Sequence, residues 1–298
     1  MWDKKHLLDI ESLSREDIEF IIKCTELLEP YSTKGNNLDI CKGEILINAF
    51  FEPSTRTEMS FATAMHALGG NVQSFKSGGS SIEKGENKED TIRILEQYCD
   101  IIVIRDPGIG SVKNYARSVN IPIINAGDGS SGHPTQALMD LYTIKKEIGR
   151  LDDIKLVFMA DLKYARTVHS LREAIEKFKN NKIYGIAPKG LESEDIEMTT
   201  IDELKDIKPD VFYITRVQKE RIPTEQRTNL SFRFDSKILD TLPTNTKVMH
   251  AMPRVDEMDL SLDNDPRVIP FKQARYGVQT RMAILALYLG HEKEIQAL

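Results

Sequence analysis

The stretch ILINAFFEPSTRT, residues 45–57, changes its pattern halfway along, and this change indicates the fold. Its first seven residues are almost entirely apolar, as in a strand of a parallel sheet that is covered on both faces. A helical pattern follows, because four apolar residues share the spacing i, i+3, i+4, i+7 of one buried stripe. They are Phe61, Ala64, Met65 and Leu68. The stretch therefore predicts a strand, a short loop and a helix.

The same alternation continues along the chain. Strands are predicted at residues 45–51, 72–75, 101–105, 121–125, 156–159, 183–186, 211–215, 248–251 and 268–271. Helices are predicted at residues 15–28, 59–68, 89–98, 135–148, 165–178 and 281–289. Such alternation predicts an α/β protein in which an open parallel sheet carries helices on both faces.

The length of 298 residues accommodates two units of this kind. A Gly/Ser-rich stretch at residues 127–132 is the predicted boundary, and a long helix from Pro134 is expected to bridge the halves. We expect residues 1–132, completed by a C-terminal helix at about 279–298, to form one domain. Residues 133–278 are expected to form the other.

The composition narrows the class of protein. A net charge of −6 argues against a nucleic-acid partner, because proteins that bind nucleic acids usually carry an excess of basic residues. The three cysteines are scattered, without C-x-x-C spacing, which is typical of reduced thiols in the cytoplasm. No apolar run approaches the ~20 residues that cross a bilayer, and no signal peptide is recognised at residues 1–6. We expect a cytoplasmic protein without a membrane partner.

Polar side chains follow several predicted strands. Ligands of open α/β sheets bind beyond the carboxyl ends of the strands, so these side chains are candidates for a site. Arginines follow five of the strands, at positions 56, 105, 166, 216 and 254. Arginine and uncharged donors at one sheet edge of an acidic protein predict a site for a polyanion.

Residues 54–57 give the strongest local signal. Hydroxyls and free N–H groups at a helix N-terminus bind phosphate well, and the guanidinium of Arg56 suits phosphate oxygens. The alternative is an ordinary helix cap by Ser54 or Thr55. A cation in the first helical turn opposes the helix dipole unless an anion is also bound, so Arg56 favours the phosphate site.

His133 and Gln136 lie near the predicted start of the bridging helix, where Pro134 suits the first position. No histidine or carboxylate stands near His133 at metal-ligand spacing, so we interpret it as a hydrogen-bond donor. The run at residues 78–86 has, by composition alone, the character of a solvated surface loop. There is no Walker A or nucleophile-elbow motif.

Several longer motifs resemble one family. FFEPSTRT at 50–57 resembles the carbamoyl-phosphate signature of the aspartate and ornithine carbamoyltransferases. Further motifs resemble the aspartate branch: AGDG at 126–129 with HPTQ at 133–136, DLKYARTVHS at 161–170, TRVQKER at 215–221 and HAMPRVDE at 250–257. They occur in the family's order and extend from Glu44 to about Leu289.

The resemblance implies transfer of a carbamoyl group from carbamoyl phosphate to L-aspartate, an early step of pyrimidine biosynthesis, without cofactor or metal. One alternative is the ornithine branch, which recognises a cationic side chain and carries a cysteine in the His-x-x-Pro loop. That loop is cysteine-free here, and Arg166 and Arg216 suit a dicarboxylate. A second alternative is a non-catalytic homologue that acts as a binding partner.

The resemblance also assigns roles to residues. Those implied to bind carbamoyl phosphate are Ser54, Thr55, Arg56, Thr57, Arg105, His133, Gln136 and, through the backbone, Met252 and Pro253. Those implied to bind aspartate are Lys84, Arg166, Arg216 and Gln218. The implied catalytic residues are Arg56, Thr57, Lys84, Arg105 and His133.

The same resemblance implies an assembly. Ser80 and Lys84 match residues that reach the neighbouring subunit's site, so a homotrimer with shared sites is expected, and a separate regulatory chain is an open possibility. Glu52, with Arg166 and Arg221, matches an ion-pair set that holds the two domains closed.

Some positions depart from the family's pattern. Glu58 and Ala62 replace an arginine and a glutamate, and Asp106 stands where histidine is frequent. HAMPR at 250–254 replaces His-Pro-Leu-Pro-Arg, so the loop lacks one proline through Ala251. The segment at 188–206 is shorter than usual. We expect these changes to affect affinity and domain closure more than the reaction.

Overall fold

The computed structural model describes residues 1–298 except residues 1, 34, 77–81, 83–84, 130–131 and 219–231. The chain forms two compact units, Met1–Tyr142 with Arg275–Leu298, and Thr143–Ala274. Within the described residues, no helix has both the length and the apolar character needed to cross a membrane.

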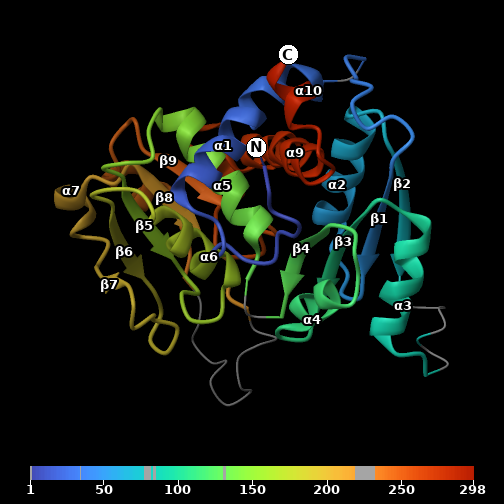
Figure 1. Ribbon diagram of the computed structural model, residues 1–298. Coiled ribbons are helices and arrows are strands. Elements are labelled where there is room, and N and C mark those ends of the chain that lie inside the picture. Colours follow the sequence, from blue (N-terminus) through green and yellow to red (C-terminus); the bar gives the residue numbers. More distant parts are fainter. Residues whose placement is uncertain (1, 34, 77–81, 83–84, 130–131, 219–231) are drawn as a thin grey trace. The chain divides into compact units, whose positions relative to one another are not determined.

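The first unit contains a four-stranded parallel sheet in the order β2-β1-β3-β4 (Figure 1). Its strands are β1 (Ile45–Phe50), β2 (Asn71–Lys76), β3 (Ile101–Asp106) and β4 (Ile123–Asp128). Its helices are α1 (Arg15–Leu28), η1 (Glu29–Ser32), α2 (Thr55–Ala67), α3 (Lys88–Leu95), η3 (Glu96–Tyr98), α4 (Ser111–Arg117) and α10 (Glu292–Gln296).

Both faces of this sheet are covered. On one face Ile47 and Ala49 of β1 join a buried cluster with Ile92 of α3 and Val112 of α4. Asn48 points to the opposite face, where its side-chain amide donates to the backbone carbonyl of Glu58 in α2 at 3.4 Å. This explains why residues 45–51 are apolar at nearly every position.

The second unit contains a five-stranded parallel sheet in the order β7-β6-β5-β8-β9. Its strands are β5 (Lys155–Met159), β6 (Lys182–Ile186), β7 (Glu197–Met198), β8 (Val211–Ile214) and β9 (Lys247–His250). Its helices are α6 (Arg166–Ile175), α7 (Leu204–Ile207), α8 (Ser236–Thr241) and η6 (Leu260–Asn264).

The core of the second unit also lies on both faces of its sheet. Val157 of β5 and Phe212 of β8 pack with Leu239 of α8 in one buried cluster. Their neighbours Phe158 and Tyr213 point the other way, are fully buried, and contact each other edge to face with ring centroids 5.5 Å apart. The predicted α/β class with two parallel sheets is confirmed.

Two helices contain residues of both units. The division falls inside α5 (Pro134–Ile148), after Tyr142, and inside α9 (Pro270–Tyr288), before Arg275. The predicted bridging helix from Pro134 is therefore present. The expected limits at residues 132 and 278 separate two parts by the ligand that each is expected to bind, and they stay predictions.

One predicted strand is wrong. Residues 268–271 do not form a strand, because α9 begins at Pro270, and Val268 makes only an isolated bridge to Val248. Val268 is apolar because it belongs to the buried cluster of the second unit. Helix α9 also starts earlier than the predicted residue 281. Its early part includes Gly277, where a Cβ atom would lie 2.6 Å from the Arg281 guanidinium and 2.8 Å from the Met139 sulfur.

Helix α1 begins with a capping box that yields a stability prediction. The Ser14 hydroxyl accepts from the Asp17 N–H at 3.1 Å, and the Asp17 carboxylate accepts from the Ser14 N–H at 2.8 Å. We expect Ser14→Ala to lower the free energy of unfolding by about 1 kcal/mol, measured by urea denaturation. The control is Thr63→Ala in α2, where an exposed hydroxyl donates to the Met59 carbonyl and helix propensity favours alanine. An equal loss in both variants would contradict the capping role.

Candidate functional site

The candidate phosphate-binding residues of the first unit follow β1. Helix α2 begins at Thr55, so Arg56 and Thr57 lie in its first turn. The Ser54 hydroxyl makes no capping bond to the described helix backbone and donates instead to the Thr57 hydroxyl at 3.0 Å. The ordinary side-chain cap, which was the alternative for this segment, is not formed by Ser54. This helix N-terminus therefore has the chemistry of an anion site.

Arg105 is the residue before the last of β3, which lies next to β1 in the sheet. It is Phe50's partner in the strand register, and its backbone carbonyl accepts from the Phe51 N–H at 2.8 Å. The residue is 9% exposed, and its guanidinium lies 3.0 Å from the Glu52 carboxylate and donates to the Ala126 carbonyl at 3.3 Å. The register thus brings Glu52 and Arg105 together at the carboxyl edge that also carries residues 54–57. Within the described chain, Glu52 pairs with Arg105, and Arg221 of its implied closing set lies outside the described residues.

Asp106 takes a structural role at the position where the family often has histidine. Its carboxylate is buried and accepts from the Lys88 ammonium at 2.8 Å, from the Tyr115 hydroxyl at 3.1 Å and from the Gly108 N–H at 2.7 Å. Burial, followed by the charge of Asp106, raises the pKa of Tyr115. These bonds fix the end of β3 beside Arg105 and tie it to the first residue of α3.

His133 and Gln136 lie at the start of α5, and both are buried. The His133 carbonyl accepts from the Gln136 N–H at 3.0 Å, so the two residues share the first turn. The Gln136 side-chain amide donates to Asp140 at 3.0 Å. This bond orients Gln136, and the i, i+4 spacing of Gln136 and Asp140 was the only sequence signal for it.

A fully buried arginine supports this part of the first unit. Arg281 of α9 lies over the Phe61 ring of α2 at 5.1 Å and donates to the Met139 sulfur of α5 at 3.5 Å. Burial lowers the pKa of Arg281 to about 10, and the charge of Asp140 opposes that shift. The helices that carry residues 54–57 and Gln136 are therefore packed on one buried cation. Sequence analysis did not identify Arg281 or Asp140.

In the second unit, Asp161 organises the loop after β5. The carboxylate is fully buried and accepts from the Tyr164 N–H at 2.8 Å and the Gln218 N–H at 3.0 Å. Its own N–H donates to the Thr215 hydroxyl at 3.2 Å. Burial raises the pKa of Asp161, against the opposing effect of these N–H donors. Asp161 thereby links the loops after β5 and β8.

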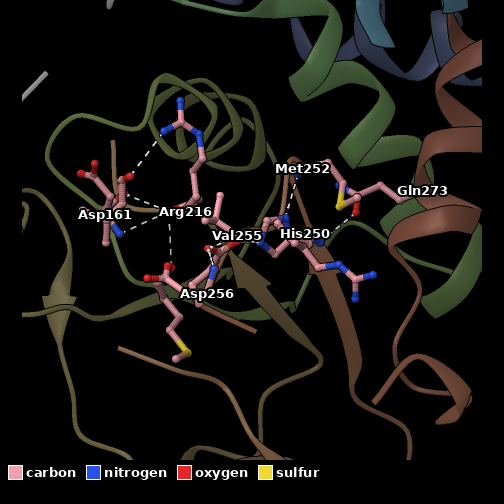
Figure 2. A network of polar contacts seen from close by, with 12 residues as sticks. Asp161, Arg216, His250, Met252, Val255, Asp256 and Gln273 are labelled. Carbon is pink, nitrogen blue, oxygen red and sulfur yellow. Dashed lines mark hydrogen bonds and ion pairs between the residues drawn. The ribbon is translucent and has the colours of Figure 1, made fainter. Parts of the chain in front are cut away.

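The candidate aspartate-binding residues of this unit lie on those loops. Arg166 is buried at the first position of α6, and Arg216 and Gln218 are half-buried after β8. An Arg216 guanidinium nitrogen lies 3.4 Å from the Val217 carbonyl. Figure 2 shows Asp161 and Arg216 on one side of a polar network, and His250, Met252 and Gln273 on the other.

The loop after β9 is held by His250. Its Nδ1 accepts from the Met252 N–H at 2.8 Å, so Nε2 carries the proton and donates to Glu257 at 2.7 Å (Figure 2). The His250 N–H donates to Gln273 at 2.9 Å. Burial opposes the ionisation of Glu257, but its hydrogen bonds from His250 and the backbone prevail, and the pKa of Glu257 is lowered.

The hydrogen bonds of His250 restrain the loop after β9, as the proline that the family usually has at the position of Ala251 would do. Met252 has φ +48° and precedes a cis peptide bond to Pro253. Arg254 forms a two-point ion pair with Asp263 and lies over the Phe271 ring at 5.3 Å. Arg254 is therefore a structural residue here, although sequence analysis counted it among the strand-end arginines.

The implied residues divide between the units. The first contains residues 54–57, Arg105, His133 and Gln136, and the second contains Arg166, Arg216, Gln218, Met252 and Pro253. Ser80 and Lys84 lie outside the described residues. The structure brings several of them to sheet edges, and their roles toward substrates stay predictions.

Two family models match most of the chain. The aspartate/ornithine carbamoyltransferase carbamoyl-P binding domain matches residues 5–146, and the Asp/Orn binding domain of the same family matches residues 152–288. The chain is 46% identical over 295 residues to the aspartate carbamoyltransferase catalytic subunit of Archaeoglobus fulgidus, covering 95% of this chain and 98% of that one. It is 43% identical to that of Thermococcus onnurineus, covering 97% and 98%.

Solved structures agree. The catalytic subunit of M. jannaschii aspartate transcarbamoylase is 40% identical with a TM-score of 0.87, covering 99% of each chain. The Trypanosoma cruzi aspartate transcarbamoylase in complex with carbamoyl phosphate and aspartate is 36% identical with a TM-score of 0.89, covering 95% of this chain and 96% of that one. The chain therefore belongs to the aspartate/ornithine carbamoyltransferase family.

Proposed function

We propose that the chain transfers the carbamoyl group of carbamoyl phosphate to the amino group of L-aspartate. The products are N-carbamoyl-L-aspartate and phosphate, in an early step of de novo pyrimidine biosynthesis. The observation that carries this proposal is the α2 N-terminus with its hydroxyls and Arg56, at the same sheet edge as Arg105. The names of the curated relatives, and a relative's structure with both substrates, support it.

The phosphoryl end of carbamoyl phosphate suits the first unit. The N–H groups at the N-terminus of α2 and the dipole of this helix favour a bound phosphate, and the hydroxyls of residues 54, 55 and 57 add donors. Arg105 now pairs with Glu52 at 3.0 Å, and a phosphate would compete with that carboxylate for the same guanidinium. Binding would then release Glu52 for the closing ion pairs implied with Arg166 and Arg221.

The carbamoyl carbon is the reacting centre. The neutral amine of aspartate attacks it, a tetrahedral oxyanion forms, and phosphate leaves with the proton of the amine. Arg56, Thr57 and His133 are the proposed donors to the oxyanion, where one fixed donor is worth about 2.7–4 kcal/mol. Gln136 and the backbone of Met252 and Pro253 would hold the carbamoyl group. No covalent intermediate and no cofactor is needed.

Recognition of aspartate is assigned to the second unit. Arg166 and Arg216 would pair with its two carboxylates, assisted by Gln218 and Lys84. Asp161 supports this role, because it fixes the backbone at Gln218 through a 3.0 Å hydrogen bond. Two arginines favour a dicarboxylate over a cationic substrate, so the ornithine branch is not favoured.

We further propose a cytoplasmic homotrimer in which Ser80 and Lys84 complete the neighbouring subunit's site. All three cysteines are free, which is consistent with a reducing compartment. Functionally, residues 1–132 with about 279–298 would bind carbamoyl phosphate, and residues 133–278 would bind aspartate. A separate regulatory chain could join such a trimer.

The proposed reaction is tested by two assays on the purified full chain. Carbamoyl phosphate is supplied with aspartate in one and with ornithine in the other, and released phosphate and the carbamoylated amino acid are measured. We expect turnover with aspartate alone. Turnover with ornithine alone would support the other branch, and inactivity toward both with no carbamoyl phosphate binding would support the non-catalytic alternative.

Arg56→Ala tests the oxyanion assignment. We expect kcat to fall by roughly 10²–10³, far more than KM rises, because the donor acts mainly in the transition state. The matched control is Arg93→Ala, an exposed arginine on α3 that lies 3.8 Å from Asp90, and its kinetics should equal those of the unaltered enzyme. An unchanged kcat for Arg56→Ala would show that Arg56 does not stabilise the oxyanion.

Arg216→Ala tests the aspartate assignment. Loss of one carboxylate partner should raise the KM for aspartate by at least about tenfold, since a charge-assisted hydrogen bond contributes about 1.5–3 kcal/mol. Binding of carbamoyl phosphate, measured by calorimetry in the same variant, should stay unchanged. If aspartate KM is unaltered while carbamoyl phosphate binding weakens, Arg216 belongs to the other substrate.

A further inference from the structure

Three different metal-ligating side chains meet in the first unit, away from the anion-binding residues. They are Cys41, Glu44 and His291, and one ligand atom from each lies within 4.8 Å of the other two. The His291 Nε2 is 2.9 Å from the Glu44 carboxylate. A thiol, a carboxylate and an imidazole are the ligands that zinc uses in proteins, whereas calcium and magnesium prefer oxygen alone.

Backbone hydrogen bonds hold the first two side chains together. The Glu44 N–H donates to the Cys41 carbonyl at 3.1 Å, which closes a four-residue turn just before β1. Gly43 has φ +90° in this turn, a conformation that glycine adopts without strain. Cys41 and Glu44 therefore stand at the two ends of one turn, so their approach does not depend on flexible side chains alone.

His291 is also positioned by its backbone. Helix α9 ends at Tyr288, Gly290 follows with φ +90°, and the His291 N–H donates back to the Ala286 carbonyl at 2.9 Å. The His291 carbonyl then accepts from the Ile295 N–H at 3.1 Å, which starts α10. The imidazole thus projects from a fixed junction between two helices.

We propose that Cys41, Glu44 and His291 bind a divalent transition metal of the zinc class. Zinc–sulfur and zinc–nitrogen bonds of about 2.3 and 2.0 Å put tetrahedral ligand atoms roughly 3.3–3.7 Å apart. The three atoms now lie within 4.8 Å of one another, so none needs to approach another by more than about 1.5 Å, and the His291 and Glu44 atoms, 2.9 Å apart, need to separate slightly. Rotation of the half-buried Glu44 and His291 side chains allows this. Three protein ligands leave a fourth position for water.

Glu294 adds the support that metal-bound histidines commonly have. Its carboxylate lies 3.9 Å from the His291 Nδ1, one helical turn away. A carboxylate at the second ring nitrogen fixes the tautomer in which the first nitrogen is the metal ligand. Glu44 and His291 side chains are 25% and 19% exposed, while Cys41 is fully buried behind them. The metal would enter from the solvent side.

A reactive thiol is the competing interpretation of Cys41. Cys41 is fully buried, so reagents in solution have little access to its thiol. The geometry of three unlike ligands therefore favours a metal over redox or nucleophilic chemistry.

No metal site was expected from the sequence, because the cysteines lack C-x-x-C spacing and no histidine or carboxylate stands near His133 at the short spacing that is typical of metal-binding motifs. The Glu44 and His291 ligands are 247 residues apart in sequence, and only the fold brings them together. A metal there would link the start of β1 to the C-terminal helix α10. Residues 54–57 follow the far end of β1, about 20 Å away at ~3.3 Å for each of its six residues. The proposal is therefore independent of the proposed reaction.

The test begins with Co²⁺ as a spectroscopic probe for zinc. The full chain is stripped with a chelator and titrated with Co²⁺, and we expect one ion per chain with a thiolate-to-cobalt charge-transfer band and tetrahedral d–d bands. Zn²⁺ should displace the Co²⁺ and raise the thermal unfolding midpoint. These measurements need no variant, so they decide the proposal even if a substitution disturbs folding.

Variants identify the ligands. Cys41→Ser and His291→Gln should each weaken Zn²⁺ binding by at least about 100-fold. Loss of the thiolate should abolish the charge-transfer band, and loss of the imidazole should change the coordination geometry that the d–d bands report. Glu294→Gln should weaken Zn²⁺ binding by about tenfold. Cys99→Ser, at a half-buried thiol elsewhere in the first unit, is the matched control and should bind Zn²⁺ normally. A Co²⁺ complex without a thiolate band, or Zn²⁺ affinity unaffected in both ligand variants, would overturn the proposal.

Discussion

The parallel pairing of β1 with β3 is the constraint on which the first unit depends. Both strands are buried on two faces, so most polar side chains of this region lie at or beyond the carboxyl ends of the strands. In a parallel sheet these ends share one edge, and the pairing of Phe50 with Arg105 sets which side chains meet there. A shift of one residue would turn Arg105 toward the other face of the sheet and remove it from the edge.

Charge at this edge must be balanced. Arg105 is nearly buried, and a guanidinium in that position needs an anionic partner, which Glu52 provides at 3.0 Å. A phosphate has the same charge sign and the same two-point geometry, so ligand and carboxylate are alternatives for one cation. Arg281 is buried between helices, where it packs on the Phe61 ring and lies within the influence of the Asp140 charge. It is suited to hold helices and not to bind ligands.

Local patterns predicted the elements well, and long-range partners poorly. The strand and helix at residues 45–67 follow from apolar spacing. Val268 was misassigned because burial in a loop gives the same apolar letters as a strand. Arg281 lies near the charge of Asp140, and Gln273 accepts from the His250 N–H. The members of each pair lie well apart in sequence, so no local pattern joins them. The roles of residues 54–57 came from the resemblance joined to helix-terminus physics.

The departures from the family's pattern are compensated, which bears on the non-catalytic alternative. Asp106 is locked by Lys88 and Tyr115, so it stabilises the end of β3 and leaves Arg105 to Glu52. The loop without its usual proline is held through His250, whose two ring nitrogens are both hydrogen-bonded. Both loops are therefore held in place by hydrogen bonds within the chain, so the departures at Asp106 and Ala251 give no reason to favour the non-catalytic alternative.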